Sequence, residues 1–226
     1  MLLLALDSSA TASVALGRQE ADGQLTILAQ RTSADTRSHA EVMTPYVQEV
    51  LEEAGVSAKD LDALICGTGP GPFTGLRAGI VTARTLALAW KKPLYGLMSL
   101  TALAQQVAPV ARSAGQEEFL VASDARRREI YWASYRLTDE GYQLLQGPTV
   151  GPASQAPQLA AYGMGASLYP QDLQAQTGYD QLQPAADQLL AAALKAGLEN
   201  LSTDTSPLYL RESDAKVPET RKKVGP

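Results

Sequence analysis

The segment GTGPGPFTGLRAG, residues 67–79, is the most informative stretch of the chain. An apolar run at residues 62–67 leads into it, and small and apolar residues continue beyond it as far as Trp90. Alternating glycine and proline give a rigid, irregular loop, and Thr74 is of a type that caps a helix start. A β-prone run at residues 93–98 comes next. The order strand, helix, strand predicts a parallel crossover and therefore an α/β fold.

The residues before this crossover predict a three-stranded meander and one helix. Short apolar or β-prone runs alternate with turn-forming residues, as is typical of antiparallel hairpins, at residues 2–6, 12–17 and 24–31. Ser38 can cap a helix in which apolar residues recur at helical spacing until Gly55. The crossover should add parallel strands to this meander.

The second part of the chain repeats this pattern in a shorter form. A helix is expected at 99–110, and the polar stretch 112–118 is the best domain boundary. The later elements are expected as strands at 118–123, 129–137, 142–150 and 158–163 and as a helix at 185–196. The sequence therefore predicts two related α/β halves, residues 1–111 and 112–226, with segment 206–211 folding back on the body.

Composition restricts the class of protein. The 226 residues are 45% hydrophobic and 19% charged, which fits a globular protein, and no run is long enough to cross a bilayer. Cys66 is the single cysteine, so disulfides are excluded and a cytoplasmic location is expected. The net charge of −5 disfavours direct binding to a phosphate backbone, so any RNA should be held mainly by another subunit. The basic tail, with Lys216 and residues 221–223, is expected to be a solvated end.

Three segments are candidates for a nucleotide cleft. The turn Asp7, Ser8 and Ser9 can bring backbone N–H groups and a carboxylate to a phosphate or its metal, although by itself such a turn is more often a plain β-turn. With duplicated halves, this turn resembles the first phosphate loop of the actin, sugar-kinase and heat-shock ATPase superfamily, which has a ribonuclease H-like fold. The corresponding second hairpin, in SDARRREIYWA at 123–133, carries arginines where small residues would admit phosphate, so a competent cleft is doubtful. Gly163 and Gly165 resemble the adenosine-contacting glycines, and a strand-to-helix turn is the alternative.

Two features concern partners and metals. The Gly-Pro loop is expected to present N–H groups outward, and the helix after it carries small residues at every fourth position, Gly75, Gly79, Ala83 and Ala87. Such a stripe permits close approach either of the chain's own sheet or of a partner helix. His39 is the only histidine and has Met43 four residues later, so no histidine-paired metal site is expected and His39 should be a surface or interface residue.

Several segments together resemble the TsaB family from end to end. They are LALDSSATASVAL at 4–16, SHAEVMTP at 38–45, GTGPGPFTGLRAG at 67–79, SDARRREIYWA at 123–133 and PLYLR at 207–211. Pro72 stands where the family usually has serine, and Arg126 to Arg128 make an unusually basic turn. The resemblance implies the ribonuclease H-like fold of the superfamily.

The resemblance also implies a function. A chain of this kind is a non-catalytic scaffold that pairs with TsaD, works with TsaE and supports threonylcarbamoyl transfer to adenosine beside the tRNA anticodon. It implies a contact through the first two helices, a homodimer when the chain is alone, tRNA contact only through the complex, and no cofactor or metal. The interface residues expected on this basis are His39, Met43, Tyr46, Val47, Phe73, Thr74, Gly75, Gly79, Ala83 and Ala87. A small-molecule kinase or ATPase of the same superfamily is the alternative, disfavoured by the arginines of the second hairpin.

Overall fold

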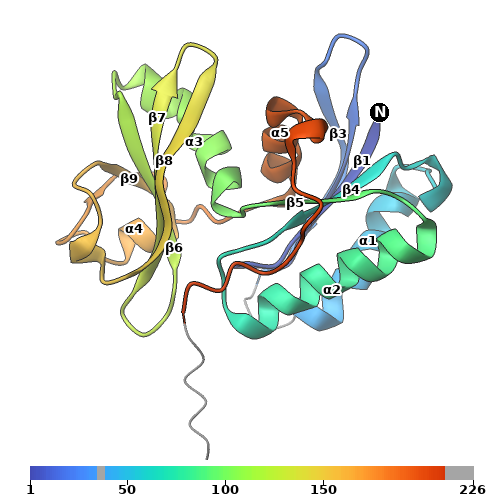
Figure 1. The fold of residues 1–226 in the computed structure, drawn as a ribbon, viewed down its shortest axis with the longest axis horizontal. Helices are drawn as coiled ribbons and strands as arrows, with labels where there is room; N and C mark the ends of the chain where they lie inside the picture. The colour runs from blue at the N-terminus through green and yellow to red at the C-terminus, as the bar shows by residue number, and fades with distance from the viewer. Residues whose placement is uncertain (35–38, 212–226) are drawn as a thin grey trace, which may run out of the picture.

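The computed structural model describes residues 1–34 and 39–211 and contains two five-stranded sheets that stand side by side (Figure 1). The first sheet has the order β3-β2-β1-β4-β5. Its strands are β1 (Leu2–Asp7), β2 (Ser13–Gln19), β3 (Leu25–Thr32), β4 (Ala63–Gly67) and β5 (Leu94–Leu97). β1 pairs antiparallel with β2 and parallel with β4, and β4 pairs parallel with β5. The meander and the crossover predicted from the sequence are therefore confirmed.

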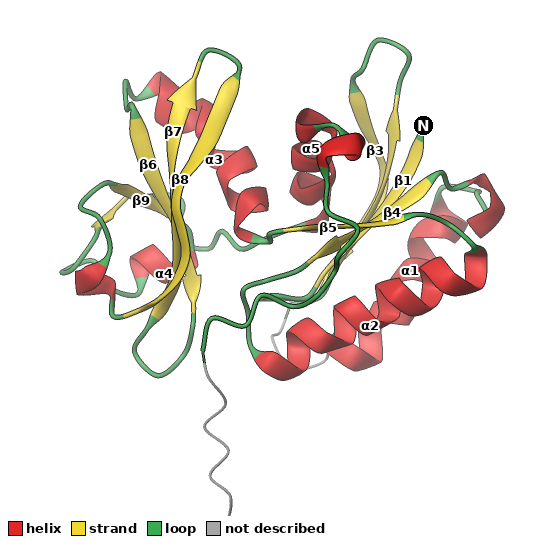
Figure 2. Cartoon of the chain, viewed as in Figure 1, coloured by secondary structure: helices red, strands yellow, loops and turns green. Residues whose placement is uncertain are grey.

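Helices cover both faces of the first sheet (Figure 2). Helices α1 (His39–Glu53) and α2 (Phe73–Trp90) pack on one face, where Leu4, Leu6 and Leu64 join the same core as Met43 and Ile80. Helix α5 (Ala186–Ala196) packs on the other face with the alternate residues of the same strands. Because strand side chains alternate between faces and both faces are covered, residues 2–6 of β1 are all apolar and buried.

The second sheet repeats the strand arrangement of the first, with the order β10-β9-β6-β7-β8. Its elements are β6 (Glu118–Asp124), β7 (Ile130–Thr138), β8 (Gly141–Gly151), β9 (Ala160–Tyr162), β10 (Gln174–Ala175) and the short α4 (Met164–Ser167). Each sheet thus places its third, second, first, fourth and fifth strands in that spatial order. The fold is the duplicated α/β fold expected from the sequence, with a shorter second half.

The last helix of each half is exchanged between the halves. Helix α3 (Leu100–Ser113) packs into the aromatic core of the second sheet, with Phe119, Tyr135 and Tyr162. Helix α5 instead lies on the first sheet, where the backbone N of Ala186 donates a hydrogen bond to Ser13 Oγ at 3.0 Å. The expected division between residues 111 and 112 therefore does not follow the two cores, because helical periodicity does not say which sheet a helix will cover.

The segment Leu201–Arg211, here named the strap, returns across both halves (Figure 1). The backbone N of Gly96 in β5 donates to Ser202 O at 2.8 Å, and the backbone N of Leu208 donates to Thr68 O at 2.8 Å. At its end the Arg211 guanidinium pairs with Glu129 of the second half. The predicted return of segment 206–211 to the body is confirmed.

Three local expectations need correction. Helix α2 begins at Phe73 after Pro72, and the side chain of its N-cap residue makes no capping hydrogen bond, so Thr74 is not its cap. Helix α3 continues through Pro109 to Ser113, and the edge strand β10 was not predicted. The predicted cap Ser38 and the basic tail lie outside the described residues. Within residues 1–34 and 39–211, no helix is both long and apolar enough to cross a membrane.

Candidate functional site

The Asp7 carboxylate is committed to hydrogen bonds within the chain. Asp7 is fully buried at the end of β1. Its Oδ1 accepts from the backbone N of Ser9 at 2.8 Å and from Ser9 Oγ at 2.7 Å, while its Oδ2 accepts from Ser99 Oγ at 2.5 Å. A buried carboxylate with these donors stabilises the turn after β1 and holds it against the residue that precedes α3. The structure thus favours the plain-turn interpretation over phosphate or metal binding by Asp7.

Ser8 joins the same turn to helix α2. Its Oγ donates to Gly75 O at 2.8 Å and accepts from the backbone N of Gly79 at 3.1 Å. A Cβ added to Gly79 would lie 2.3 Å from Ser8 Oγ, so only glycine fits there without a shift of the turn. Ser8 therefore fixes α2 against the end of β1, and its side chain is not directed at a ligand.

The β6–β7 hairpin, expected as the second phosphate loop, approaches the first turn across a small hollow. Asp124 accepts from the backbone N of Arg126 at 2.8 Å and pairs with its guanidinium at 3.0 Å. The hollow measures about 40 Å³, whereas small-molecule sites measure roughly 300–1,000 Å³. Its lining residues are Ser9, Ala10, Pro72, Ser123, Asp124, Arg126, Met164 and Gln183. The described residues of this cleft leave no nucleotide-sized space, which weighs against the kinase or ATPase alternative.

Gly163 and Gly165 are explained by close packing on β6. Gly163 has φ +98°, and an added Cβ would lie 2.5 Å from Ala122 O. An added Cβ at Gly165 would lie 2.7 Å from backbone atoms of Ser123. Both glycines let the chain pass from β9 into α4 directly against the neighbouring strand. The strand-to-helix turn, which was the alternative to an adenosine contact, accounts for both residues.

The small-residue stripe of α2 faces the chain's own core. Gly75, Gly79, Ala83 and Ala87 are all buried, and the core on this face also contains Met43 and Val47 of α1. All six side chains are covered within the monomer, so their part in a partner interface stays a prediction that this burial does not favour. The stripe admits the first sheet and α1, which was one of the two outcomes that its spacing allowed.

The opposite face of α2 is exposed and carries large apolar side chains. Val81 is 59% exposed and Leu88 is 82% exposed, and Phe73 at the helix start is 39% exposed. Thr74 is also exposed, whereas Tyr46 of α1 is half-buried against the first core. The side chain of His39 lies outside the described residues. Of the expected interface residues, Phe73, Thr74 and Tyr46 remain accessible on these two helices.

Sequence reasoning missed Val81 and Leu88. The signal was present, because these two apolar residues lie seven positions apart and share the helix face opposite the stripe. The interpretation of the small residues as the contact surface left the large apolar residues of the same helix out of the predicted interface. We name Val81 and Leu88 the apolar face of α2.

The described residues contain no group of three or more His, Cys, Asp or Glu side chains that is placed to hold a metal ion. Cys66 is buried in β4, and burial raises the pKa of its thiol well above the usual value. A buried neutral thiol is a poor nucleophile and a poor metal ligand. Absence of a bound metal remains a prediction that elemental analysis of the purified protein would test.

Comparisons with known proteins agree with this geometry. A family model described as "TsaD: tRNA N6-adenosine threonylcarbamoyltransferase" matches residues 26–165. The tRNA threonylcarbamoyladenosine biosynthesis protein TsaB of Escherichia coli K12 is 33% identical over 79% of this chain and 83% of its own length. An uncharacterized protein of Mycobacterium tuberculosis H37Rv is 37% identical over 85% of this chain and 84% of its own length.

A solved structure shares the whole architecture. The structure of YeaZ from Pseudomonas aeruginosa superposes with a TM-score of 0.76 at 32% identity, covering 92% of this chain and 99% of that one. The similarity therefore extends over both sheets and the exchanged helices. On sequence identity, coverage and fold together, this chain belongs to the TsaB (YeaZ) family.

Proposed function

We propose that this chain acts in the biosynthesis of threonylcarbamoyladenosine in tRNA as a non-catalytic subunit. In this proposal it pairs with TsaD, the transferase, works with TsaE, and carries no cofactor. The E. coli relative named TsaB supports the pathway. In the turn after β1, the Asp7 carboxylate accepts hydrogen bonds from Ser9 and Ser99 and is therefore committed within the chain. This arrangement supports a subunit that does not itself bind or hydrolyse a nucleotide.

The apolar face of α2 carries the partner assignment. The core-facing stripe of the helix is already packed, yet the opposite face keeps Val81 and Leu88 in solvent at 59% and 82% exposure. Exposed apolar side chains that gather on one part of a protein surface are typical of protein contacts, and Val81 and Leu88 share one helix face. Burying them should contribute about 25 cal/mol for each Å² removed from water. The same face would serve the TsaD complex and the homodimer of the isolated chain, so the two would compete.

Substitution of the apolar face tests this assignment. Val81→Ser and Leu88→Gln should each weaken TsaD binding about tenfold, because full burial of a valine or leucine side chain contributes roughly 1.5–3 kcal/mol and a factor of ten corresponds to about 1.4 kcal/mol. The melting temperature should change little, because both side chains are exposed. The matched control is Leu145→Gln, since Leu145 is an apolar residue with 41% exposure on β8 of the other half.

Binding is measured by calorimetry with purified TsaD, and self-association by sedimentation of the chain alone. Unchanged TsaD affinity in both α2 variants would remove the apolar face from the interface. The non-catalytic role is tested separately by the ATPase rate of the isolated chain. Steady turnover that disappears in an Asp7→Ala variant whose circular dichroism shows it to be folded would restore the kinase or ATPase alternative, since it would trace the activity to this turn.

A further inference from the structure

The turn of the β6–β7 hairpin consists of three consecutive arginines in an unfavourable backbone conformation. Arg126, Arg127 and Arg128 have φ of 61°, 56° and 65°, all in the left-handed region. Residues with a Cβ pay a steric penalty there, and glycine or asparagine normally occupies such positions. A turn that needed only this backbone shape would be more stable without arginine. The backbone shape of the turn therefore does not by itself account for three arginine side chains.

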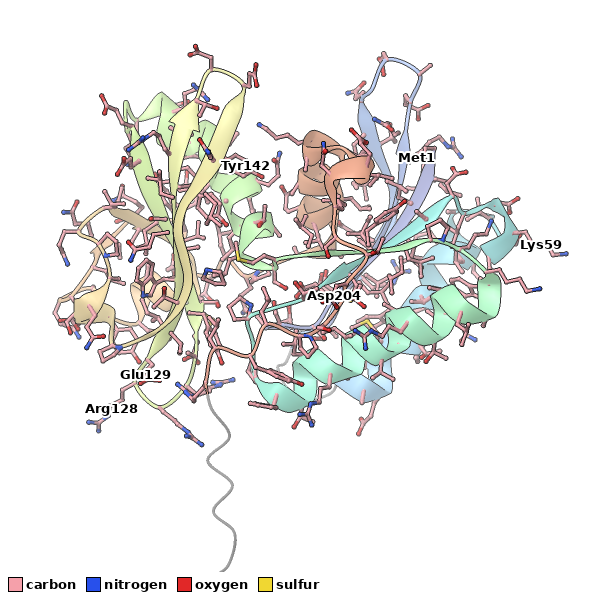
Figure 3. All side chains as sticks on the ribbon, in the orientation of Figure 1. Met1, Lys59, Arg128, Glu129, Tyr142 and Asp204 are labelled. Atoms are coloured by element: carbon pink, nitrogen blue, oxygen red, sulfur yellow. The ribbon has the colours of Figure 1, made fainter. Side chains whose placement is uncertain are left out.

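The turn is held rigidly in place by contacts at its base. The backbone N of Ala125 donates to Glu129 O at 3.1 Å, and the backbone N of Glu129 donates to Arg126 O at 3.0 Å. Arg211 at the end of the strap donates to Ala125 O at 3.3 Å and pairs with Glu129. These contacts fix the position from which the arginine side chains extend. Figure 3 shows Arg128 at the tip of the hairpin, extending away from the second half.

A hollow of about 200 Å³ lies between this turn, the Gly-Pro loop and the strap. Its lining residues are Gly71, Pro72, Phe73, Ala125, Arg126, Arg127, Tyr131, Leu208, Tyr209, Leu210 and Arg211. The hollow is smaller than the roughly 300–1,000 Å³ of typical small-molecule sites. It therefore suits one group of a larger ligand, such as a phosphate and its sugar, better than a free nucleotide.

Aromatic rings and a further guanidinium border this hollow. The rings of Phe73 and Tyr209 stack at a centroid distance of 4.3 Å, and both remain about 40% exposed. The Arg77 guanidinium lies 4.9 Å from the Phe73 ring centroid and donates to Tyr209 Oη at 2.6 Å. A guanidinium group can donate two parallel hydrogen bonds to a phosphate, and partly exposed aromatic rings can stack on bases. Proteins that bind single-stranded RNA combine these two kinds of side chain.

We propose that the Arg126–Arg128 turn and the adjoining hollow bind the phosphate backbone of RNA directly. The chain has a net charge of −5, yet Arg126, Arg127 and Arg211 line one hollow, and Arg77 lies over the two aromatic rings at its border. This revises the sequence-based expectation that RNA is held only through other subunits, since the averaged charge concealed a local basic site. The inference rests on the proposed function for the identity of the RNA, which is the tRNA substrate.

Glycine substitution separates binding from folding. Arg127→Gly and Arg128→Gly each remove a guanidinium and also relieve the left-handed backbone, so the melting temperature should stay the same or rise. RNA affinity should fall on the order of threefold for each lost phosphate contact. The slope of log K against log salt should become shallower by about 0.7 for each contact. A fold defect cannot imitate this result, because it would lower stability and affinity together.

The probe is a fluorescent, unmodified tRNA anticodon stem-loop, titrated by anisotropy between 50 and 200 mM KCl with the chain alone and with its TsaD complex. Arg136→Gln is the matched control. Arg136 is an arginine of the same β6–β7 hairpin, with a side chain that is 58% exposed and pairs with Glu118 of β6. It lies at the end of the β6–β7 pair opposite the Arg126–Arg128 turn, so Arg136→Gln should bind like the wild type.

Three results would overturn the proposal. They are wild-type affinity in both glycine variants, an equal loss in Arg136→Gln, or intact RNA binding with lost TsaD binding. The last result would identify the turn as a protein contact. Failure of the proposed function is distinguishable, because it appears as absent TsaD binding by the wild type, which leaves the RNA titration of the isolated chain interpretable.

Discussion

Ser99 Oγ lies 2.5 Å from Asp7 Oδ2 and donates a hydrogen bond to it, although the two residues are 92 positions apart. This contact connects the end of β1 to the residue that precedes α3, the helix that covers the second sheet. The Asp7 carboxylate therefore connects the two halves of the chain.

Asp7→Asn should destabilise the fold. The amide group replaces one accepting oxygen with a donor, so one of the donors from Ser9 or Ser99 loses its partner inside the protein. We expect a loss of about 1–3 kcal/mol in the free energy of unfolding, measured by urea denaturation. Asp22→Asn is the control, because Asp22 Oδ1 also accepts from a backbone N two residues later, that of Gln24, but at an exposed turn. Equal effects of the two substitutions would contradict the assigned role of Asp7.

Gly79→Ala should also be destabilising, even though alanine favours helices by roughly 1 kcal/mol relative to glycine. The new Cβ would lie 2.3 Å from Ser8 Oγ and must displace it. Ser8→Ala removes that oxygen, so adding it to Gly79→Ala should cost less than its effect in the wild type. A double-mutant cycle by thermal unfolding measures this coupling. Strict additivity would show that the Ser8 hydroxyl is not the obstacle.

Ala83→Leu should lower stability by about 1–3 kcal/mol through overpacking, because Ala83 is fully buried in the first core. Ala89→Leu places the same side chain on the exposed side of the same helix and should stay within about 0.5 kcal/mol of the wild type. Thermal unfolding of both variants makes the comparison. A stable Ala83→Leu protein that had lost TsaD binding would return the stripe to the interface.

Stability should decrease at alkaline pH. Burial raises the pKa of the Cys66 thiol and of the Tyr135 phenol, so both stay neutral in the folded state. In the unfolded chain the pKa of a thiol is about 8.5 and that of a phenol is about 10. Because the folded pKa values are the higher ones, the stabilisation is complete below the unfolded values and decreases progressively as pH rises from the unfolded pKa towards the folded pKa.

Urea midpoints between pH 7.5 and 10.5 measure this decrease. In Cys66→Ala the loss that begins near about pH 8.5 should disappear, while the loss above about pH 10 remains. An unchanged profile in Cys66→Ala would show that the thiol is not responsible.

Tyr209→Ala should release the distal part of the strap. It removes the ring that stacks on Phe73 and the oxygen that accepts from Arg77. The amide of Leu208, which donates to Thr68 O, should then exchange faster with deuterium, while the amide of Gly96, bonded to Ser202 at the other end, should change less. Tyr209→Phe keeps the stack and should retain most of the protection. Equal acceleration at both amides would mean that the strap opens as one unit.

The strands and the crossover were predictable because their signals are local. Alternating apolar residues and turn formers define the meander, and the glycine-proline loop separates β4 from α2. The sequence did not predict whether the α2 stripe would pack on the chain's own sheet or on a partner, because periodicity identifies a helix face but not the surface that covers it. The burial of Asp7 was equally hidden, since its donor Ser99 comes from a distant segment. The exchange of α3 and α5 is likewise decided by packing between elements far apart in sequence.

The exchanged helix α5 also sets an order for folding during synthesis. The second sheet and α3 form one continuous stretch, from Leu100 to Ala175, and can assemble as soon as that stretch leaves the ribosome. The first sheet was made earlier, yet one of its faces, with Leu3, Ala5 and Ile65, stays uncovered until α5 emerges some 180 residues after β1. We therefore expect the first sheet of the nascent chain to complete its folding last. Until α5 covers it, the exposed apolar face of this sheet should bind a chaperone.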